Sequence, residues 1–378
     1  MRVRIKEVPT VSLYVHFPFC ESKCPYCAFY SVRPRKGDME EYFSSLSLEI
    51  DLIEKEMQGF PPVKTLYIGG GTPTIASSGI WKNMVSILEN RFRFFQETEV
   101  TVEANPGSMT REQVMIWKDW RVTRVSLGVQ SLEDRYLETL GRIHDSRQAR
   151  QAMERTNSAG LSLSVDMLFG LPDQKMEVWI RDLGEIISLG VDHVSTYQLS
   201  LEDGTPWGDF PPTNIPDGYP FYRWAQYYLE KHGFRQYEIA SFARPGEWCR
   251  HNVAYWFRKD VIGLGPSAWG FIKGVRTGNI RDLRKYSSML RAGIRPVCVR
   301  EELDPREQAS EAAILALRTR WGIRFERFRK MYGERALEDL LSRLDELPSR
   351  LMRRNPWSAV LTRDGMRVGN AVWERLLP

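Results

Sequence analysis

The sequence predicts an α/β protein: a partial, TIM-like (β/α)6 barrel followed by a small, mostly helical C-terminal domain. Three observations lead to this prediction. Short apolar or alternating runs, typical of buried strands, recur through the first 200 residues. Segments with helical periodicity separate them, and such alternation favours a parallel sheet. From about Pro305 onward the chain becomes helical and rich in arginine.

The elements of the barrel follow from these runs in chain order. The predicted strands cover residues 11–17, 63–71, 98–104, 124–130, 161–170 and 191–200. The predicted helices between them cover residues 39–57, 80–89, 111–120, 132–140, 146–159 and 176–189. Six strand–helix repeats indicate a barrel or most of one.

The pattern changes after about residue 213. A helix is expected over residues 221–232 and a strand over residues 235–243, and Pro296 with the charged stretch after it marks a boundary. The tail is expected to be helical with a closing hairpin. We therefore predict three regions: a core barrel over 1–212, a barrel extension over 213–300 and a C-terminal domain over 301–378.

Composition narrows the class of protein. Apolar residues make up 42% of the chain, which is enough for a large core, and the net charge of +5 decides little about partners. We find no signal-peptide pattern and no apolar run long enough to span a bilayer. Five cysteines in a chain of 378 residues favour the reducing cytoplasm, where clustered cysteines usually bind a metal or react.

Three of those cysteines, Cys20, Cys24 and Cys27, lie within eight residues. Thiolates suit zinc or iron–sulfur clusters. A structural zinc site needs four ligands, for which His16 is a nearby candidate. A cubane cluster also normally takes four thiolates, so three would leave one iron open to another ligand. Spacing alone leaves both metals open.

Polar residues and glycines gather where the predicted strands end. Residues 69–71 are three glycines, and Glu103, Gln130 and Asp166 lie at the ends of the next three strands. The carboxyl ends of parallel strands meet at one edge, where α/β proteins bind their ligands. Glycine lets the backbone approach a ligand closely because it has no Cβ. The sequence therefore predicts a binding site at this edge.

The cysteine spacing together with "GGGTPT" resembles the radical S-adenosylmethionine superfamily. The chain also carries "VEANPGS", "SLGVQS", "LGRIHD", "VDMLFGLP", "YQLSLEDGTPW" and "CRHNVAYW" in family order. These motifs narrow the resemblance to the oxygen-independent coproporphyrinogen III oxidase group and its heme chaperone branch. The resemblance covers nearly the whole chain, including the C-terminal domain from about Asp304.

The resemblance implies a [4Fe–4S] cluster on the three cysteines and S-adenosylmethionine on its open iron. It implies that the first S-adenosylmethionine is held by Tyr14, Gly70 and Glu103. The positions that hold a second one in the oxidase are Gly71, Thr72, Gln130, Arg142 and Asp166, and Phe29 also belongs to the implied cofactor-binding set. Carboxylates suit ribose hydroxyls or an amino group, and a guanidinium suits a carboxylate.

A heme site is implied in "CRHNVAYW". His251 is the expected axial ligand, with Tyr255 and Trp256 bordering the porphyrin. The alternative is a packed turn with a hydrogen-bonded histidine. In "GLGPSAWG", Trp269 stands where a histidine is common in this branch, so a second axial contact there is not predicted.

The implied function is that of a cytoplasmic heme chaperone that delivers heme to an unknown acceptor protein and binds no nucleic acid. A homodimer and a peripheral membrane association are left open. The alternatives are a radical enzyme acting on a tetrapyrrole in porphyrin biosynthesis and a zinc-stabilised binding module. Coproporphyrinogen III oxidation is not expected, because Phe29 replaces a further cysteine of the oxidase. In addition, only thirteen residues precede Tyr14, where the oxidase has a long extension.

Overall fold

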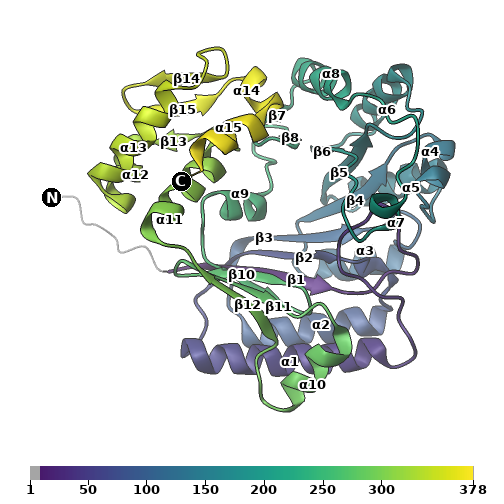
Figure 1. Ribbon diagram of the computed structural model, residues 1–378. Helices are drawn as coiled ribbons and strands as arrows, with labels where there is room; N and C mark the ends of the chain where they lie inside the picture. The colour runs from purple at the N-terminus through teal and green to yellow at the C-terminus, as the bar shows by residue number, and fades with distance from the viewer. Residues whose placement is uncertain (1–8, 378) are drawn as a thin grey trace.

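The computed structural model describes residues 9–377, and most of these residues belong to one long sheet with its covering helices (Figure 1). The strands of this sheet are β1 (Val11–Phe17), β2 (Val63–Gly70), β3 (Phe94–Ala104), β4 (Arg124–Gln130), β5 (Ser162–Phe169), β6 (His193–Gln198), β7 (Arg235–Gln236), β8 (Ser241–Ala243), β9 (Val261–Leu264), β10 (Trp269–Ile272), β11 (Val275–Asn279) and β12 (Val297–Glu302). Their spatial order is β12-β11-β10-β9-β1-β2-β3-β4-β5-β6-β8-β7.

The centre of the sheet is parallel and its edges are antiparallel. Strands β9 and β1 to β6 pair in parallel, while β10 to β12 extend one edge and β8 and β7 the other. The register pairs Phe17 with Gly70, Glu103 with Ser126, and Gly128 with Asp166. The carboxyl ends of the central strands therefore lie side by side, as the barrel prediction requires.

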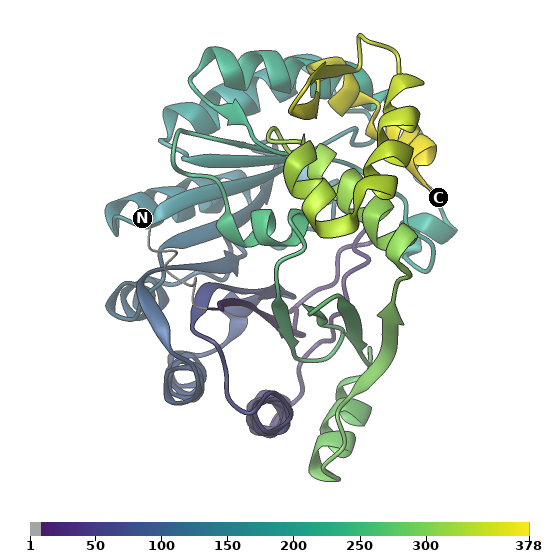
Figure 2. The ribbon, with the colours of Figure 1, turned by 90° about the vertical axis from the view of Figure 1, so that its left-hand side faces the viewer.

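Helices cover the outer face of the sheet, and Figure 2 shows them around the strands. They are α1 (Asp38–Met57), α2 (Ser78–Arg91), α3 (Arg111–Asp119), α4 (Asp134–Thr139), α5 (Ser146–Ser158), α6 (Met176–Ser188), α8 (Gly218–Lys231) and α10 (Leu283–Arg291), with a 3₁₀ turn at Pro73–Ile75. Two short helices lie elsewhere: α7 (Pro206–Asp209) contacts the loop after β1, and α9 (Arg250–Trp256) packs against the inner face of β2. Outward side chains of the strands, such as Leu13 and Leu66, are fully buried beneath these helices. Because side chains alternate along a strand, the other set faces the interior of the barrel.

The C-terminal domain has its own core. It comprises α11 (Pro305–Leu317), β13 (Ile323–Arg324), α12 (Phe325–Tyr332), α13 (Glu334–Asp345), β14 (Met352–Asn355), β15 (Ser358–Leu361), α14 (Arg363–Arg367) and α15 (Gly369–Leu376). Its three short strands form a second sheet, in the order β13-β15-β14. A capping box of Asp304 and Glu307, with Pro305 in the first turn, begins the domain at α11. Its buried apolar residues form a cluster separate from that of the barrel.

Every strand and helix predicted for the core barrel is present, with bounds shifted by a few residues at most ends. The prediction of one strand over residues 235–243 was wrong. The chain reverses there into β7 and β8, because Glu238 Oε1 accepts the N–H of Ala240 and tightens the turn. The boundary predicted at residue 301 falls inside β12, which continues the large sheet. The hairpin of the tail is followed by α14 and α15.

Among residues 9–377, no helix has both the length and the apolar character needed to cross a bilayer.

Candidate functional site

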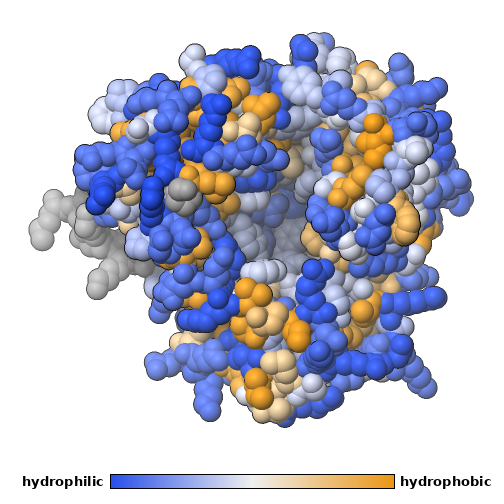
Figure 3. Space-filling model, viewed as in Figure 1, coloured by the Kyte–Doolittle hydropathy of each residue, from blue (hydrophilic) through white to orange (hydrophobic). Residues whose placement is uncertain are grey.

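The parallel strands of the large sheet form a partial barrel, which we call the half barrel. A cavity of about 640 Å³ lies inside it, beside the carboxyl ends of the central strands. Figure 3 shows the face on which it opens as a hollow between the C-terminal domain and the barrel. Most of the residues predicted for the site line this one cavity: Cys20, Cys24, Cys27, Phe29, Gly70, Gly71, Thr72, Glu103, Gln130, Arg142 and Asp166. Four predicted residues do not line it: Tyr14, His251, Tyr255 and Trp256.

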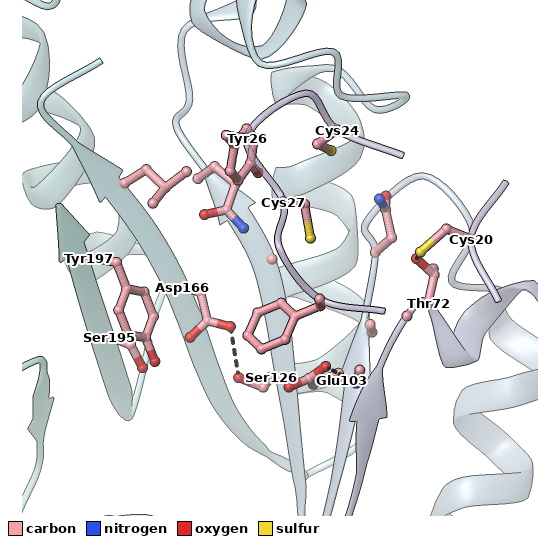
Figure 4. Close-up of a pocket in the computed structure, with 18 of the residues that line it drawn as sticks. Cys20, Cys24, Tyr26, Cys27, Thr72, Glu103, Ser126, Asp166, Ser195 and Tyr197 are labelled. Atoms are coloured by element: carbon pink, nitrogen blue, oxygen red, sulfur yellow. Dashed lines mark hydrogen bonds between the residues drawn. The ribbon is translucent and has the colours of Figure 1, made fainter. Parts of the chain in front are cut away.

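The cysteine loop (residues 18–37) connects β1 to α1 and passes over the cavity. A bridge between Phe19 and Val32 closes its base, and all three thiols are partly exposed and free of disulfides. Figure 4 shows them above the strands that carry Glu103, Ser126 and Asp166. The loop therefore presents soft ligands to the cavity.

The surroundings of the three thiols differ. Cys20 Sγ lies 3.4 Å from Thr72 Oγ1, and Cys24 Sγ lies 3.7 Å from Arg142 Nη1. Burial raises the pKa of the Cys27 thiol. In the part of the chain that the structure describes, no three His, Cys, Asp or Glu side chains are arranged to hold a single metal ion. Three half-exposed thiols at a cavity mouth nevertheless form a donor set suited to iron–sulfur chemistry.

The glycines at the end of β2 are required by close contacts. Gly70 has a φ of +105°, and a Cβ there would lie 2.3 Å from His16 Nδ1. A Cβ on Gly69 would lie 2.5 Å from the carboxyl carbon of Glu103. The backbone of this motif therefore lies against Glu103 in a way that no other residue type permits.

Glu103 is held from two sides. Its Oε1 accepts the hydroxyl of Tyr67 at 2.8 Å, and its Oε2 accepts the N–H of Gly70 at 2.8 Å. Burial raises the pKa of this carboxyl, while both hydrogen bonds favour the charged form. These bonds orient the carboxylate and leave lone pairs for a ligand in the cavity.

Asp166 lies deeper in the cavity, on β5. The Ser126 hydroxyl donates to its Oδ2 at 3.2 Å. Burial raises the pKa of Asp166 to about 7, and the nearby charge of Glu103 adds to the shift. Figure 4 shows Ser195 and Tyr197 on the neighbouring strand facing the same space. Asp166 can therefore gain or lose a proton near neutral pH.

Arg142 and Gln130 lie below the cysteine loop. The Nη2 of Arg142 donates to the carbonyl of Gly128 at 2.8 Å, while its Nη1 faces Cys24. Gln130 ends β4 with a φ of +67°, at an irregularity in the β4–β5 pairing. Arg142 thus lies beside the thiols as well as beside the predicted ligand space.

The predicted residues on β1 are already bonded to one another. The Tyr14 hydroxyl lies 3.0 Å from His16 Nδ1, and His16 Nε2 lies 2.9 Å from the carbonyl of Tyr30. Because both ring nitrogens of His16 are engaged, the alternative of His16 as a fourth zinc ligand has no support in this geometry.

His251 lies inside the protein and is 1% exposed. Its Nδ1 is 2.9 Å from Thr65 Oγ1, and its Nε2 has no hydrogen-bond partner among residues 9–377. Burial lowers the pKa of the imidazole to about 3, so the ring is neutral. The packed histidine that was the alternative expectation thus describes the observed state, apart from this unpartnered nitrogen.

The other residues predicted for heme face in different directions. The Tyr255 ring packs edge-on against His251 at 5.3 Å, whereas Trp256 lies beneath the guanidinium of Arg318 from the C-terminal domain. A separate cavity of about 230 Å³ is lined by Tyr255, Trp256 and Trp269. His251 does not line it, so the structure does not bring His251 and Trp256 to one surface.

Sequence reasoning missed many polar residues of the cavity wall. They are Tyr67, Thr101, Arg124, Ser126, Ser164, His193, Ser195, Tyr197, Cys249 and Asn252. The sequence did contain a signal for the strand residues, because side chains two positions apart on a strand face the same side. Ser164 stands two residues before Asp166 on β5, and Ser195 and Tyr197 stand two residues apart on β6. No spacing rule relates Cys249 and Asn252 to these strands, because they come from a distant segment.

Comparisons with known proteins identify the family to which this chain is similar. A family model described as the Radical SAM superfamily matches residues 14–186. The chain is 34% identical over 377 residues to "Heme chaperone HemW" of Bacillus subtilis (strain 168), covering 97% of this chain and 99% of that protein. It is 37% identical over 270 residues to "Heme chaperone HemW" of Escherichia coli (strain K12), covering 70% and 71%.

Among solved structures, the fold resembles that titled "Coproporphyrinogen III oxidase (HemN) from Escherichia coli is a Radical SAM enzyme". The TM-score is 0.87 at 19% identity, over 99% of this chain and 91% of that one. At this identity the likeness concerns the fold alone.

Proposed function

The chain belongs to the radical S-adenosylmethionine superfamily, in the branch of the HemW heme chaperones, and from that premise we propose that it binds heme and delivers it to an acceptor protein. In this proposal it also holds a [4Fe–4S] cluster on Cys20, Cys24 and Cys27 and S-adenosylmethionine in the adjoining cavity. The observation that supports the cofactors most strongly is the gathering of three thiols, the glycine motif and two carboxylates around one cavity.

The cluster would supply an open iron and a source of electrons, and S-adenosylmethionine would supply the ligand for that iron. The chain's own residues would then do the positioning. Gly70 lines the cavity and orients Glu103 through its N–H, and the Glu103 carboxylate, oriented also by Tyr67, accepts hydrogen bonds from the ligand. Asp166, whose pKa lies at about 7, can hold or release a proton at the centre of the cavity.

His251 has the right atom for a heme ligand. The Thr65 hydroxyl donates to Ser12 Oγ at 2.8 Å, so it accepts from His251 Nδ1–H. This assigns the proton to Nδ1 and leaves a lone pair on Nε2, the atom without a partner. Iron binding by His251 therefore requires α9 to move away from β2, because the ring is enclosed.

A radical enzyme acting on a tetrapyrrole is the second candidate. The polar lining and the volume of the cavity favour it, since a chaperone does not need a site of this kind for heme alone. Phe29, 68% exposed at the cavity, stands in place of the further cysteine of the oxidase and argues against coproporphyrinogen III oxidation.

The test is a heme titration of the anaerobically reconstituted protein, with the Soret spectrum and the iron and sulfide content measured in the same preparation. We expect stoichiometric heme binding, a shifted Soret band in His251→Ala, and an unshifted band in the control His232→Ala, an exposed histidine directly after α8. Absence of heme binding by the wild-type protein would contradict the proposal. Conversion of coproporphyrinogen III to protoporphyrinogen at catalytic turnover would favour the enzyme.

A further inference from the structure

The segment predicted to bind heme also forms part of the cofactor cavity. Cys249 and Asn252 line the 640 Å³ cavity, and they stand on either side of His251 in the chain. Cys249 is 3% exposed, and Asn252 is partly buried at the cavity surface. We call residues 249–256 the wall segment, because they close the interior of the half barrel against β1 and β2.

His251 supports the cavity from behind. Its ring lies 5.2 Å from the ring of Tyr67, with 30° between the planes, and Tyr67 itself lines the cavity. Its Nδ1 is bonded to Thr65, two residues before Tyr67 and on the same face of β2. The imidazole therefore fixes the position of the Tyr67 ring with respect to its own strand.

Tyr67 connects His251 to Glu103. Its hydroxyl donates to Glu103 Oε1 at 2.8 Å, and the other carboxylate oxygen is bonded to Gly70 N–H. A displaced Tyr67 would leave Glu103 with a single orienting partner. The connection from His251 to Glu103 thus runs through one side chain.

The wall segment is anchored to the base of the sheet by Glu99. The carboxylate of Glu99, 4% exposed, accepts the N–H of Arg250 at 3.0 Å and that of His251 at 2.9 Å. Arg124 Nη2 lies 3.9 Å from the same carboxylate. Any movement that exposes His251 must therefore pull the wall away from a buried charged group.

We propose that residues 249–256 are a wall of the S-adenosylmethionine cavity, in which Asn252 contacts the bound ligand and His251 is a positioning residue for Tyr67 and Glu103. It follows that heme ligation by His251 and cofactor binding oppose each other. Because the ring of His251 is enclosed, its ligation of heme iron would require the ring to leave the position that supports Glu103, and would take Cys249 and Asn252 away from the cavity. The role of the wall rests on the S-adenosylmethionine site of the proposed function, and the opposition rests in addition on the proposed heme binding.

The proposed opposition between heme binding and S-adenosylmethionine binding is reciprocal. If heme raises the dissociation constant of S-adenosylmethionine by some factor, S-adenosylmethionine raises that of heme by the same factor. The wall would thereby link the loading and release of heme to the occupancy of the cofactor site.

The experiment measures S-adenosylmethionine affinity in the heme-free, cluster-loaded protein by equilibrium dialysis. We expect Asn252→Ala to weaken binding by roughly five- to tenfold, the loss of about one hydrogen bond, and His251→Ala by a similar factor. His251→Phe keeps a ring against Tyr67, so it should retain affinity within about twofold while abolishing axial ligation of heme. Tyr67→Phe should weaken binding because it removes one bond to Glu103. His232→Ala is the control.

Unchanged affinity in both Asn252→Ala and His251→Ala would overturn the proposal. Asn252 lies at the cavity surface, so its variant tests the wall even where His251→Ala fails to fold. Repeating the dialysis with added heme tests the opposition in the wild-type protein. If heme does not bind, the proposed delivery of heme is wrong, and the dialysis of the heme-free variants alone then decides whether residues 249–256 form part of the S-adenosylmethionine site. If heme binds through His251 and leaves the affinity for S-adenosylmethionine unchanged, the opposition is wrong.

Discussion

The cysteine loop and the wall segment were both predicted to bind a metal, and they differ in almost every physical respect. The loop is irregular, and its three thiols are partly exposed at the mouth of the cavity. The wall segment contains a helix, and its histidine is 1% exposed behind Tyr67. A motif therefore specifies the type of ligand atom, while the packing around it decides whether that atom is accessible.

The two regions are also held in different ways. Below the loop, the fully buried rings of Phe17 and Phe19 pack edge-on against Tyr42, so its base is fixed while the cysteines above it can adjust to a cluster. The wall is held by the buried carboxylate of Glu99, which joins its backbone to Arg124. Removing ligands from the loop should therefore cost little stability, whereas changing the anchor of the wall should cost much.

The largest effect is expected when the three loop cysteines are replaced together by alanine. Because they supply the thiolates proposed for the cluster, reconstituted protein should lose essentially all bound iron and sulfide and its absorbance near 400 nm. Thermal unfolding of the cluster-free protein should change little, since these three cysteines are partly exposed and lie outside the apolar core. Iron and sulfide content equal to that of the wild type would show that the cluster lies elsewhere.

Thiol alkylation should separate the loop from the wall. Burial raises the pKa of Cys249 to about 12, and its side chain is nearly inaccessible. We expect iodoacetamide to modify Cys249 at least about 100-fold more slowly than the loop cysteines in cluster-free protein at pH 8, because the thiolate is the reactive form. Mass spectrometry of the labelled peptides measures this, with exposed Cys298 as the internal control. Equal rates would mean that the wall opens readily.

Glu99→Gln tests the anchor of the wall. The substitution keeps the shape of the side chain and removes the negative charge beside buried Arg124, so we expect a loss of about 3 kcal/mol in the free energy of unfolding. Urea titration monitored by circular dichroism measures the loss. The matched control is Glu97→Gln, an exposed neighbour on the same strand. A loss no larger than that of the control would mean that Glu99 does not anchor the wall.

The smallest effect concerns Asp166, which lines the same cavity as the cysteines of the loop and Cys249 of the wall segment. Its pKa of about 7 in the folded protein exceeds the usual 3.8, so the native state binds this proton more tightly than the unfolded state. Stability should therefore fall as the pH rises from about 4 to 7, and remain lower above 7. The difference in pKa sets a limit of about 4 kcal/mol, and since the cavity admits water we expect about 1–2 kcal/mol.

Asp166→Asn should remove this dependence. Its stability relative to the wild type should increase across the interval from pH 4 to 8, as followed by thermal unfolding at each pH. Asp203→Asn, at an exposed position, should show no such increase. Parallel pH profiles for Asp166→Asn and the wild-type protein would show that Asp166 is ionised throughout.

Much of the fold could be predicted because the information was local. The alternation of Leu13, Leu66 and their neighbours along the strands identified the central sheet, and the strand ends located residues 69–71, Glu103 and Asp166 at one edge. The error at residues 235–243 arose because a side chain, Glu238, closes a turn within a run of strand-forming residues. Most of the extra edge strands span only two to five residues, and β12, which has six, is almost wholly exposed and ends in charged residues, so none carries the apolar alternation of a half-buried strand.

By itself, the sequence determined the parallel core, the three thiols and the glycine motif, because each depends on residue type and on spacing within a short stretch of chain. The packing of segments distant in the chain is what brings Cys249 and Asn252 to the cavity and turns His251 toward Tyr67 rather than toward solvent. Those relations join β2 to a helix nearly 190 residues later. Contacts at such a separation depend on how the helix packs into the half barrel, which no periodicity within either segment encodes.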